Sequence, residues 1–86
     1  MELMNYFEEM REVLETRDVN KLEEFIEKWA KKGVLENRFY LWFKHANDMV
    51  KLGTLCKMIC NKTNLTPETI EWAKQQLDKL GWDYEI

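Results

Sequence analysis

Hydrophobic residues recur at helical spacing along most of this 86-residue chain. In the first segment, four apolar side chains follow one another in steps of four, three and four, which places them on one face of a helix. They are Leu3, Phe7, Met10 and Leu14. We therefore predict a helix over residues 3–15 whose core-facing side is made of these four residues.

The second segment has the same periodicity over residues 19–32. Its apolar positions share one face: Leu22, Phe25, Ile26, Trp29 and Ala30. Asp18 or Asn20 is suited to cap the start of this helix, because a short polar side chain can accept a hydrogen bond from the first free backbone amides. Gly33 follows its end and can adopt the left-handed conformation typical of a helix C-terminus.

The third segment carries the longest pattern in the chain. Seven residues alternate in strict steps of three and four: Phe39, Trp42, Ala46, Met49, Gly53, Cys56 and Cys60. This spacing is typical of a coiled-coil seam, so we predict one long helix over residues 35–60. Glycine in a helix interior costs about 1 kcal/mol relative to alanine, so Gly53 needs either a packing reason or a kink.

The fourth segment has the clearest boundaries. Thr66 is a good N-cap residue, Pro67 is favoured at the first helical position, and Gly81 is suited to end the helix. We predict a helix over residues 67–80. Its apolar face consists of Ile70, Ala73, Leu77 and Leu80. The conformation of residues 82–86, which alternate apolar and acidic side chains, is left open.

These segments and the composition indicate an all-α fold. Apolar residues make up 45% of the chain and charged residues 34%, which is typical of a folded domain, and one Pro and three Gly leave few residues for the turns of a β fold. We expect a single helical domain over residues 1–86. Its architecture is predicted as a small compact bundle of four helices around the long third one.

The charge is distributed unevenly, although the net value is only −3. Residues 1–16 carry five acids against one base, whereas residues 34–62 carry five bases against two acids. The simplest interpretation is that acidic helices pack beside a basic one. An acidic chain with dispersed cations also argues against a nucleic-acid-binding role, for which a clustered basic patch is usual.

The residues needed for catalysis or metal binding are scarce. The chain has no Ser, and its single histidine, His45, lies eleven residues before Cys56 on the predicted helix, about 16 Å away. Cys56 and Cys60 are one turn apart but lack further soft ligands within reach for a zinc site. We therefore expect no enzyme activity, no metal and no cofactor. Without a signal-peptide or membrane-spanning pattern, we expect a cytoplasmic protein with reduced thiols.

The most unusual stretch is the run of five apolar residues over positions 39–43. On a helix, five successive side chains coat the whole circumference and need cover on all sides. Tyr40 and Leu41 fall on the outer side of the predicted helix, beside Lys44, and Trp72 lies opposite the apolar stripe of its own helix. We predict that Tyr40, Leu41, Lys44 and Trp72 contribute to a surface that binds a protein partner.

A protein-binding module is accordingly the leading functional hypothesis. In length and in its Lys-, Glu- and Asn-rich composition, the chain is similar to short reading frames of bacteriophages and mobile elements, many of which inhibit larger host proteins. This likeness rests on composition and covers no motif. It favours a small acidic inhibitor, and it leaves the identity of the partner open.

Three alternatives remain at the level of sequence. Arg38 and Lys51, with Lys44, are suited to bind phosphates in an oligomeric nucleotide- or small-ligand-binding protein. A helical nucleic-acid-binding regulator is a further alternative, although the helix that would enter a groove begins with apolar residues 39–43. A homodimer through the helix over residues 35–60 would also cover the apolar run without another partner.

Overall fold

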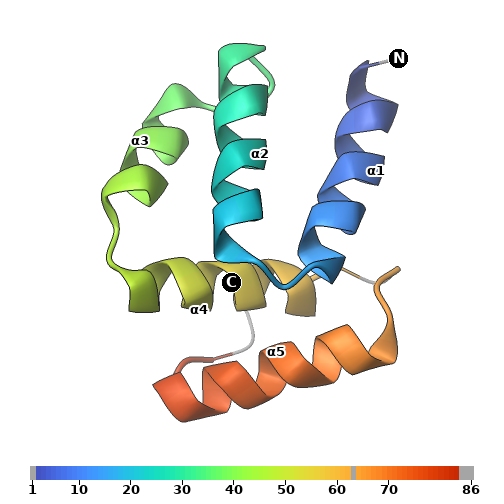
Figure 1. Ribbon diagram of the computed structural model, residues 1–86, viewed down its shortest axis with the longest axis vertical. Coiled ribbons are helices and arrows are strands. Elements are labelled where there is room, and N and C mark those ends of the chain that lie inside the picture. The colour runs from blue at the N-terminus through green and yellow to red at the C-terminus, as the bar shows by residue number, and fades with distance from the viewer. Residues whose placement is uncertain (1, 63, 84–86) are drawn as a thin grey trace.

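The computed structural model describes residues 2–62 and 64–83, and these residues form five α-helices and no strand (Figure 1). The all-α class and the compact packing predicted from the sequence are confirmed, but the number of helices is not. The helices are α1 (Glu2–Glu15), α2 (Val19–Lys31), α3 (Asn37–His45), α4 (Asp48–Cys60) and α5 (Pro67–Leu80). No described helix is both long enough and apolar enough to cross a membrane.

The helices form two layers. Figure 1 shows α1, α2 and α3 standing side by side, with α2 in the middle, while α4 runs across their lower ends and α5 lies beneath α4. The closest pair is α4 with α5, and α2 contacts α1, α3 and α4. The short α3 therefore lies at one edge of the upper layer, where α2 is its main neighbour.

The hydrophobic core draws on all five helices. Its buried apolar residues are Tyr6, Met10, Leu14, Leu22, Phe25, Ile26, Trp29, Phe43, Leu55, Cys56, Ile59, Leu65, Ala73 and Leu77. The predicted face of α2 is confirmed, because four of its five members are fully buried and Ala30 is partly so. Burial of these apolar side chains is the main force that holds the helices together.

The prediction for the first helix is wrong at Phe7, which is 52% exposed. Tyr6 takes its place in the core: its ring lies 5.4 Å from that of Phe25 and 5.3 Å from that of Trp29. Phe7 is one residue further around the helix and lies under the ammonium group of Lys62, at 5.3 Å. Tyr6 and Phe7 both lie at helical spacing from Met10, so spacing alone does not decide between them. Contacts with Phe25 and Trp29 on α2 determine that Tyr6 is the buried one.

The predicted helix over residues 35–60 is also wrong, because the chain breaks between α3 and α4. Ala46 has an extended backbone with ψ of 155°, and Asn47 caps α4 by accepting a hydrogen bond from the amide of Val50 at 2.9 Å. A capping asparagine competes with a continuous helix at this point. The seam is consequently divided between two helices that run in different directions (Figure 1).

The cap predictions are confirmed for the second and last helices. The side chain of Asp18 accepts hydrogen bonds at the start of α2, and that of Thr66 accepts one from Thr69 at the start of α5. Gly33 and Gly81 both have positive φ, at 82° and 75°. After Gly81, the amide of residue 82 bonds the carbonyl of residue 77, which is the expected C-terminal motif. Residues 84–86 of the tail lie outside the described residues.

Candidate functional site

The exposed side of α3 is the clearest apolar surface in the described part of the chain. Leu41 is 45% exposed and Trp42 is 51% exposed, although both are large hydrophobic residues. Isolated exposed apolar residues are common, but Trp42 also stacks on Phe39, three residues away on the same side of this nine-residue helix, and Leu41 adjoins them. We call Leu41 and Trp42, together with the partly buried Phe39 beside them, the α3 surface.

The side of α3 opposite the α3 surface packs into the core. Phe43 is completely buried and anchors α3 in the core. The rings of Phe39 and Trp42 are stacked with their centroids 6.0 Å apart, and both lie within 6.5 Å of the Phe43 ring. This aromatic cluster fixes the direction in which the indole of Trp42 faces, so the exposed ring is presented on a supported helix rather than on a mobile loop.

Basic residues surround the α3 surface. Arg38 and Lys44 are exposed, and residues 37–45 include no acidic side chain, although the pKa of Glu27 on α2 is lowered by Lys31 and, to a smaller extent, by the charge of Lys44. The ammonium group of Lys44 lies 5.8 Å from the centre of the Tyr40 ring, which is half-buried. The sequence-predicted residues Tyr40, Leu41 and Lys44 thus occur together on α3, where Leu41 and Lys44 are exposed and Tyr40 is half-buried.

Trp72 lies elsewhere in the fold. It is half-buried on α5, and the guanidinium of Arg17 covers its ring at 5.6 Å. Figure 1 shows α5 on the other side of α4 from α3. Trp72 therefore packs within its own chain in a different layer, and the structure does not bring it together with the α3 surface.

The two residues of the phosphate-binding alternative have different surroundings. Arg38 is exposed on α3, whereas Lys51 lies on α4 and is partly buried. The ammonium group of Lys51 binds the carboxylate of Glu23 at 2.7 Å and lies 5.9 Å from the ring of Phe43. Lys51 thus joins α4 to α2, and a phosphate would have to compete with Glu23 for it.

Met49 is a surface residue that the sequence pattern assigned to the buried seam. It is 58% exposed in the first turn of α4. The seam positions Trp42 and Met49 are both open because the break at Ala46 and Asn47 separates the two halves of the pattern. The capping potential of Asn47 was the one signal in the sequence that could have revealed this.

The nucleophilic side chains are in poor surroundings for chemistry. Cys56 is fully buried, and its burial raises the pKa of the thiol to about 12, far from the thiolate form needed for attack. Burial also raises the pKa of Cys60. His45 is exposed at the end of α3. Among the described residues, no three His, Cys, Asp or Glu side chains come together as a metal site.

Comparisons with known proteins identify no relative of the chain. No protein-family model matches the chain, and neither the curated proteins nor the solved structures contain a match.

Proposed function

We propose that this protein is a small non-enzymatic module that binds a larger protein through the α3 surface. The observation that supports the proposal best is the pair Leu41 and Trp42, about half exposed on a helix that Phe43 anchors in the core. Tryptophan is among the residues that contribute most to binding energy at interfaces, particularly when the surrounding structure already holds it in place.

The charges on α3 suggest the chemistry of the partner. Arg38 and Lys44 flank the α3 surface with no acidic neighbour on the same helix. A complementary site would be an apolar pocket for Trp42 with carboxylates at its rim, since opposite charges across an interface increase the rate and specificity of association. The likeness in composition to short bacteriophage and mobile-element reading frames is the reason to expect a larger host protein as the partner, and inhibition as the result of docking.

The same residues argue for a protein partner over a nucleotide. Of the cations considered for phosphate binding, Lys51 already has a carboxylate partner in Glu23. The remaining exposed cations, Arg38 and Lys44, border an apolar surface rather than a phosphate-binding loop. A protein pocket uses both the apolar centre and the charged border of α3.

A site-specific crosslink tests the proposal. A photoreactive phenylalanine analogue replaces Leu41 in one variant and the exposed Lys79 on α5 in a control variant, and each is expressed and irradiated in the cells that make the protein. We expect one adduct of defined mass from position 41 and none from position 79. Adding Trp42→Ala should remove most of that adduct, whereas Phe7→Ala, at a similarly exposed aromatic residue on α1, should not.

Other outcomes contradict the proposal. Adducts that are equal for positions 41 and 79, or no adduct at position 41, would show that α3 docks on nothing specific. An adduct between two copies of the chain, with a doubled mass in solution, would replace the module by a homodimer. In that case the contact would include α3 but could not be one continuous helix over residues 35–60.

A further inference from the structure

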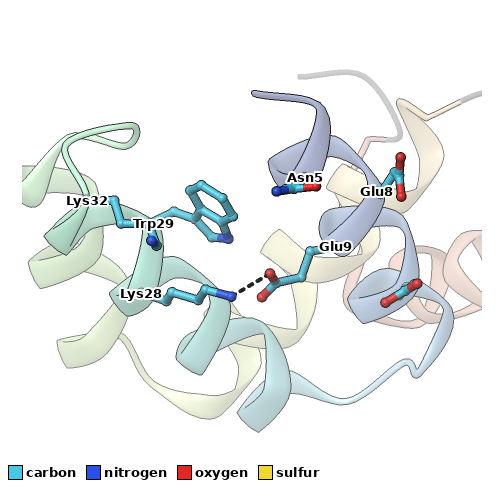
Figure 2. A pocket seen from close by; sticks show the side chains of 7 residues that line it. Asn5, Glu8, Glu9, Lys28, Trp29 and Lys32 are labelled. Atoms are coloured by element: carbon cyan, nitrogen blue, oxygen red, sulfur yellow. Dashed lines mark hydrogen bonds and ion pairs between the residues drawn. The ribbon is translucent and has the colours of Figure 1, made fainter. Parts of the chain in front are cut away.

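A groove of about 400 Å³ lies between α1 and α2, away from the α3 surface. α1 contributes an amide and three carboxylates to its lining, α2 contributes Trp29 and Lys28, and the C-cap residue Lys32 follows. Figure 2 shows Asn5 and Glu9 of α1 turned toward Trp29 and Lys28, while Glu8 lies further around α1, at the outer edge of the groove. The groove therefore offers hydrogen-bonding and charged groups of both signs around one aromatic ring.

The indole nitrogen of Trp29 has an unmet hydrogen bond in this groove. Trp29 is only 2% exposed, and its Nε1 is buried without an acceptor in the structure. Figure 2 shows the nitrogen turned toward α1, on the side where Asn5 lies. An indole N–H can only donate, and a buried donor without an acceptor is unfavourable. A ligand that brings an acceptor to Nε1 would relieve this cost.

The carboxylates of α1 show what else the ligand must carry. Glu9 is bound by Lys28, whose ammonium group lies 2.7 Å away. Glu8 and Glu12 are exposed and make no ion pair with another described residue. They are four residues apart, so their side chains lie one above the other on the same face of α1. Two neighbouring carboxylates suit a planar cation with several N–H donors.

We infer that this groove binds an arginine residue of a basic peptide segment. A peptide carbonyl next to the arginine accepts the hydrogen bond of Trp29 Nε1, and the guanidinium bridges Glu8 and Glu12. Asn5 is exposed, so its side chain can turn aside to admit the carbonyl. The site shares no residue with the α3 surface, and it stands or falls independently of the function proposed above.

Other ligand classes fit the lining less well. An inorganic anion would meet three carboxylates, of which only that of Glu9 is paired. The lysines Lys28 and Lys32 already lie over the Trp29 ring, at 5.3 and 5.6 Å from its centre, so a flat aromatic ligand has no open face to stack on there. An arginine peptide uses the unpaired carboxylates and the buried N–H donor together.

Nuclear magnetic resonance of the intact chain tests the inference. The four tryptophans give four indole N–H signals, which can be assigned by through-bond connection to their own backbone amides. The probe is N-acetyl-Gly-Arg-Gly-amide, and the control is the same peptide with citrulline, which keeps the shape and the carbonyls but has no charge. We expect the arginine peptide to move the Trp29 indole signal downfield and to leave the Trp42 signal in place.

Two pairs of substitutions, each removing two negative charges, complete the test. Glu8→Gln with Glu12→Gln should weaken arginine-peptide binding about tenfold or more, because hydrogen bonds to charged groups are lost. Glu68→Gln with Glu71→Gln, at exposed positions on α5, should leave it unchanged. The inference fails if the Trp29 signal does not respond, if the citrulline peptide binds equally well, or if the α1 pair has no effect. It also fails if the Trp29 proton of the free protein already resonates as a hydrogen-bonded one.

Discussion

The ring of Trp82 lies directly against the backbone of Gly53, in the space that a side chain at position 53 would fill. A Cβ built on Gly53 would come to 2.6 Å from Cε3 of Trp82, closer than real carbon atoms approach. α4 runs without interruption through this residue. The lack of a side chain at Gly53 therefore lets the Trp82 indole, which follows α5, pack against α4. This packing offsets the unfavourable helix propensity of glycine.

Replacing Gly53 by Ala should displace Trp82 from α4. We expect Gly53→Ala to lower the free energy of unfolding by about 1 kcal/mol, because lost indole packing outweighs the gain in helix propensity. In a Trp82→Ala background the same change should stabilise the chain by about 1 kcal/mol. Urea unfolding of the four chains measures both values. Equal effects in the two backgrounds would mean that the two residues are not coupled.

Glu15 connects the end of α1 to the start of α5. Its carboxylate accepts hydrogen bonds from the Thr69 hydroxyl at 2.6 Å, from the Thr66 amide at 2.7 Å and from the Thr66 hydroxyl at 3.0 Å. These bonds lower the pKa of Glu15 below its ordinary 4.5, with the Thr69 bond contributing most. The ionised form is thus favoured in the folded chain more than in the unfolded one.

We expect Glu15→Gln to destabilise the protein by no more than about 1 kcal/mol at neutral pH, because the carboxylate is largely solvated. A lowered folded-state pKa gives stability that is present above the ordinary pKa and is lost as the pH falls through the folded value. The difference between wild type and Glu15→Gln should therefore shrink below about pH 4.5 in urea titrations. Glu12→Gln on the same helix serves as control, and an effect of Glu15→Gln that does not change with pH would contradict this account.

Asn47 is the residue that divides α3 from α4. Replacing it by Ala removes the side-chain acceptor for the Val50 amide and should cost about 1 kcal/mol in urea unfolding. Asn47→Asp keeps an acceptor at the cap and should change stability by less than about 0.5 kcal/mol. Asn37→Ala, at another exposed position, is the matched control. An Asn47→Ala chain with unchanged stability and greater helix content by circular dichroism would instead show that α3 and α4 fuse when the cap is removed.

Most of the fold was accessible from local signals. The starts of the second and last helices depend on Asp18 and Thr66, and their ends on Gly33 and Gly81, all within a few residues of the boundary that they define. The break at Asn47 was not predicted, because seven apolar positions at regular spacing outweighed one capping residue. Hydrophobic spacing reports which positions can share a face, and it does not report whether the backbone between them stays helical.

The α3 surface was predictable only in part. The run over residues 39–43 correctly indicated apolar side chains without full cover, and Leu41 is exposed as expected. Trp42 was placed on the buried seam, yet it faces solvent, since its predicted neighbours belong to another helix. The unpaired nitrogen of Trp29 could not be found from the sequence at all, because it depends on how α1 packs against α2.

The two sides of α3 should respond differently to truncation. Phe43 is fully buried, so Phe43→Ala should lower the free energy of unfolding by about 3–5 kcal/mol, a large share of the total stability of a small domain. Leu41 is nearly half exposed, so Leu41→Ala should change it by less than about 1 kcal/mol. Urea unfolding followed by circular dichroism measures both changes on the same chain.

Comparing Leu41→Ala with Phe43→Ala distinguishes a side chain that binds a partner from one that belongs to the hydrophobic core. If α3 binds a partner, Leu41→Ala should reduce co-purification of the partner identified by the adduct at position 41 while leaving the free protein folded, whereas Phe43→Ala should impair both. The fold of each variant must be checked before its binding is compared. A Leu41→Ala chain that loses several kcal/mol of stability would show that Leu41 is covered in solution, and the α3 surface would then belong to the core of the protein rather than to an interface.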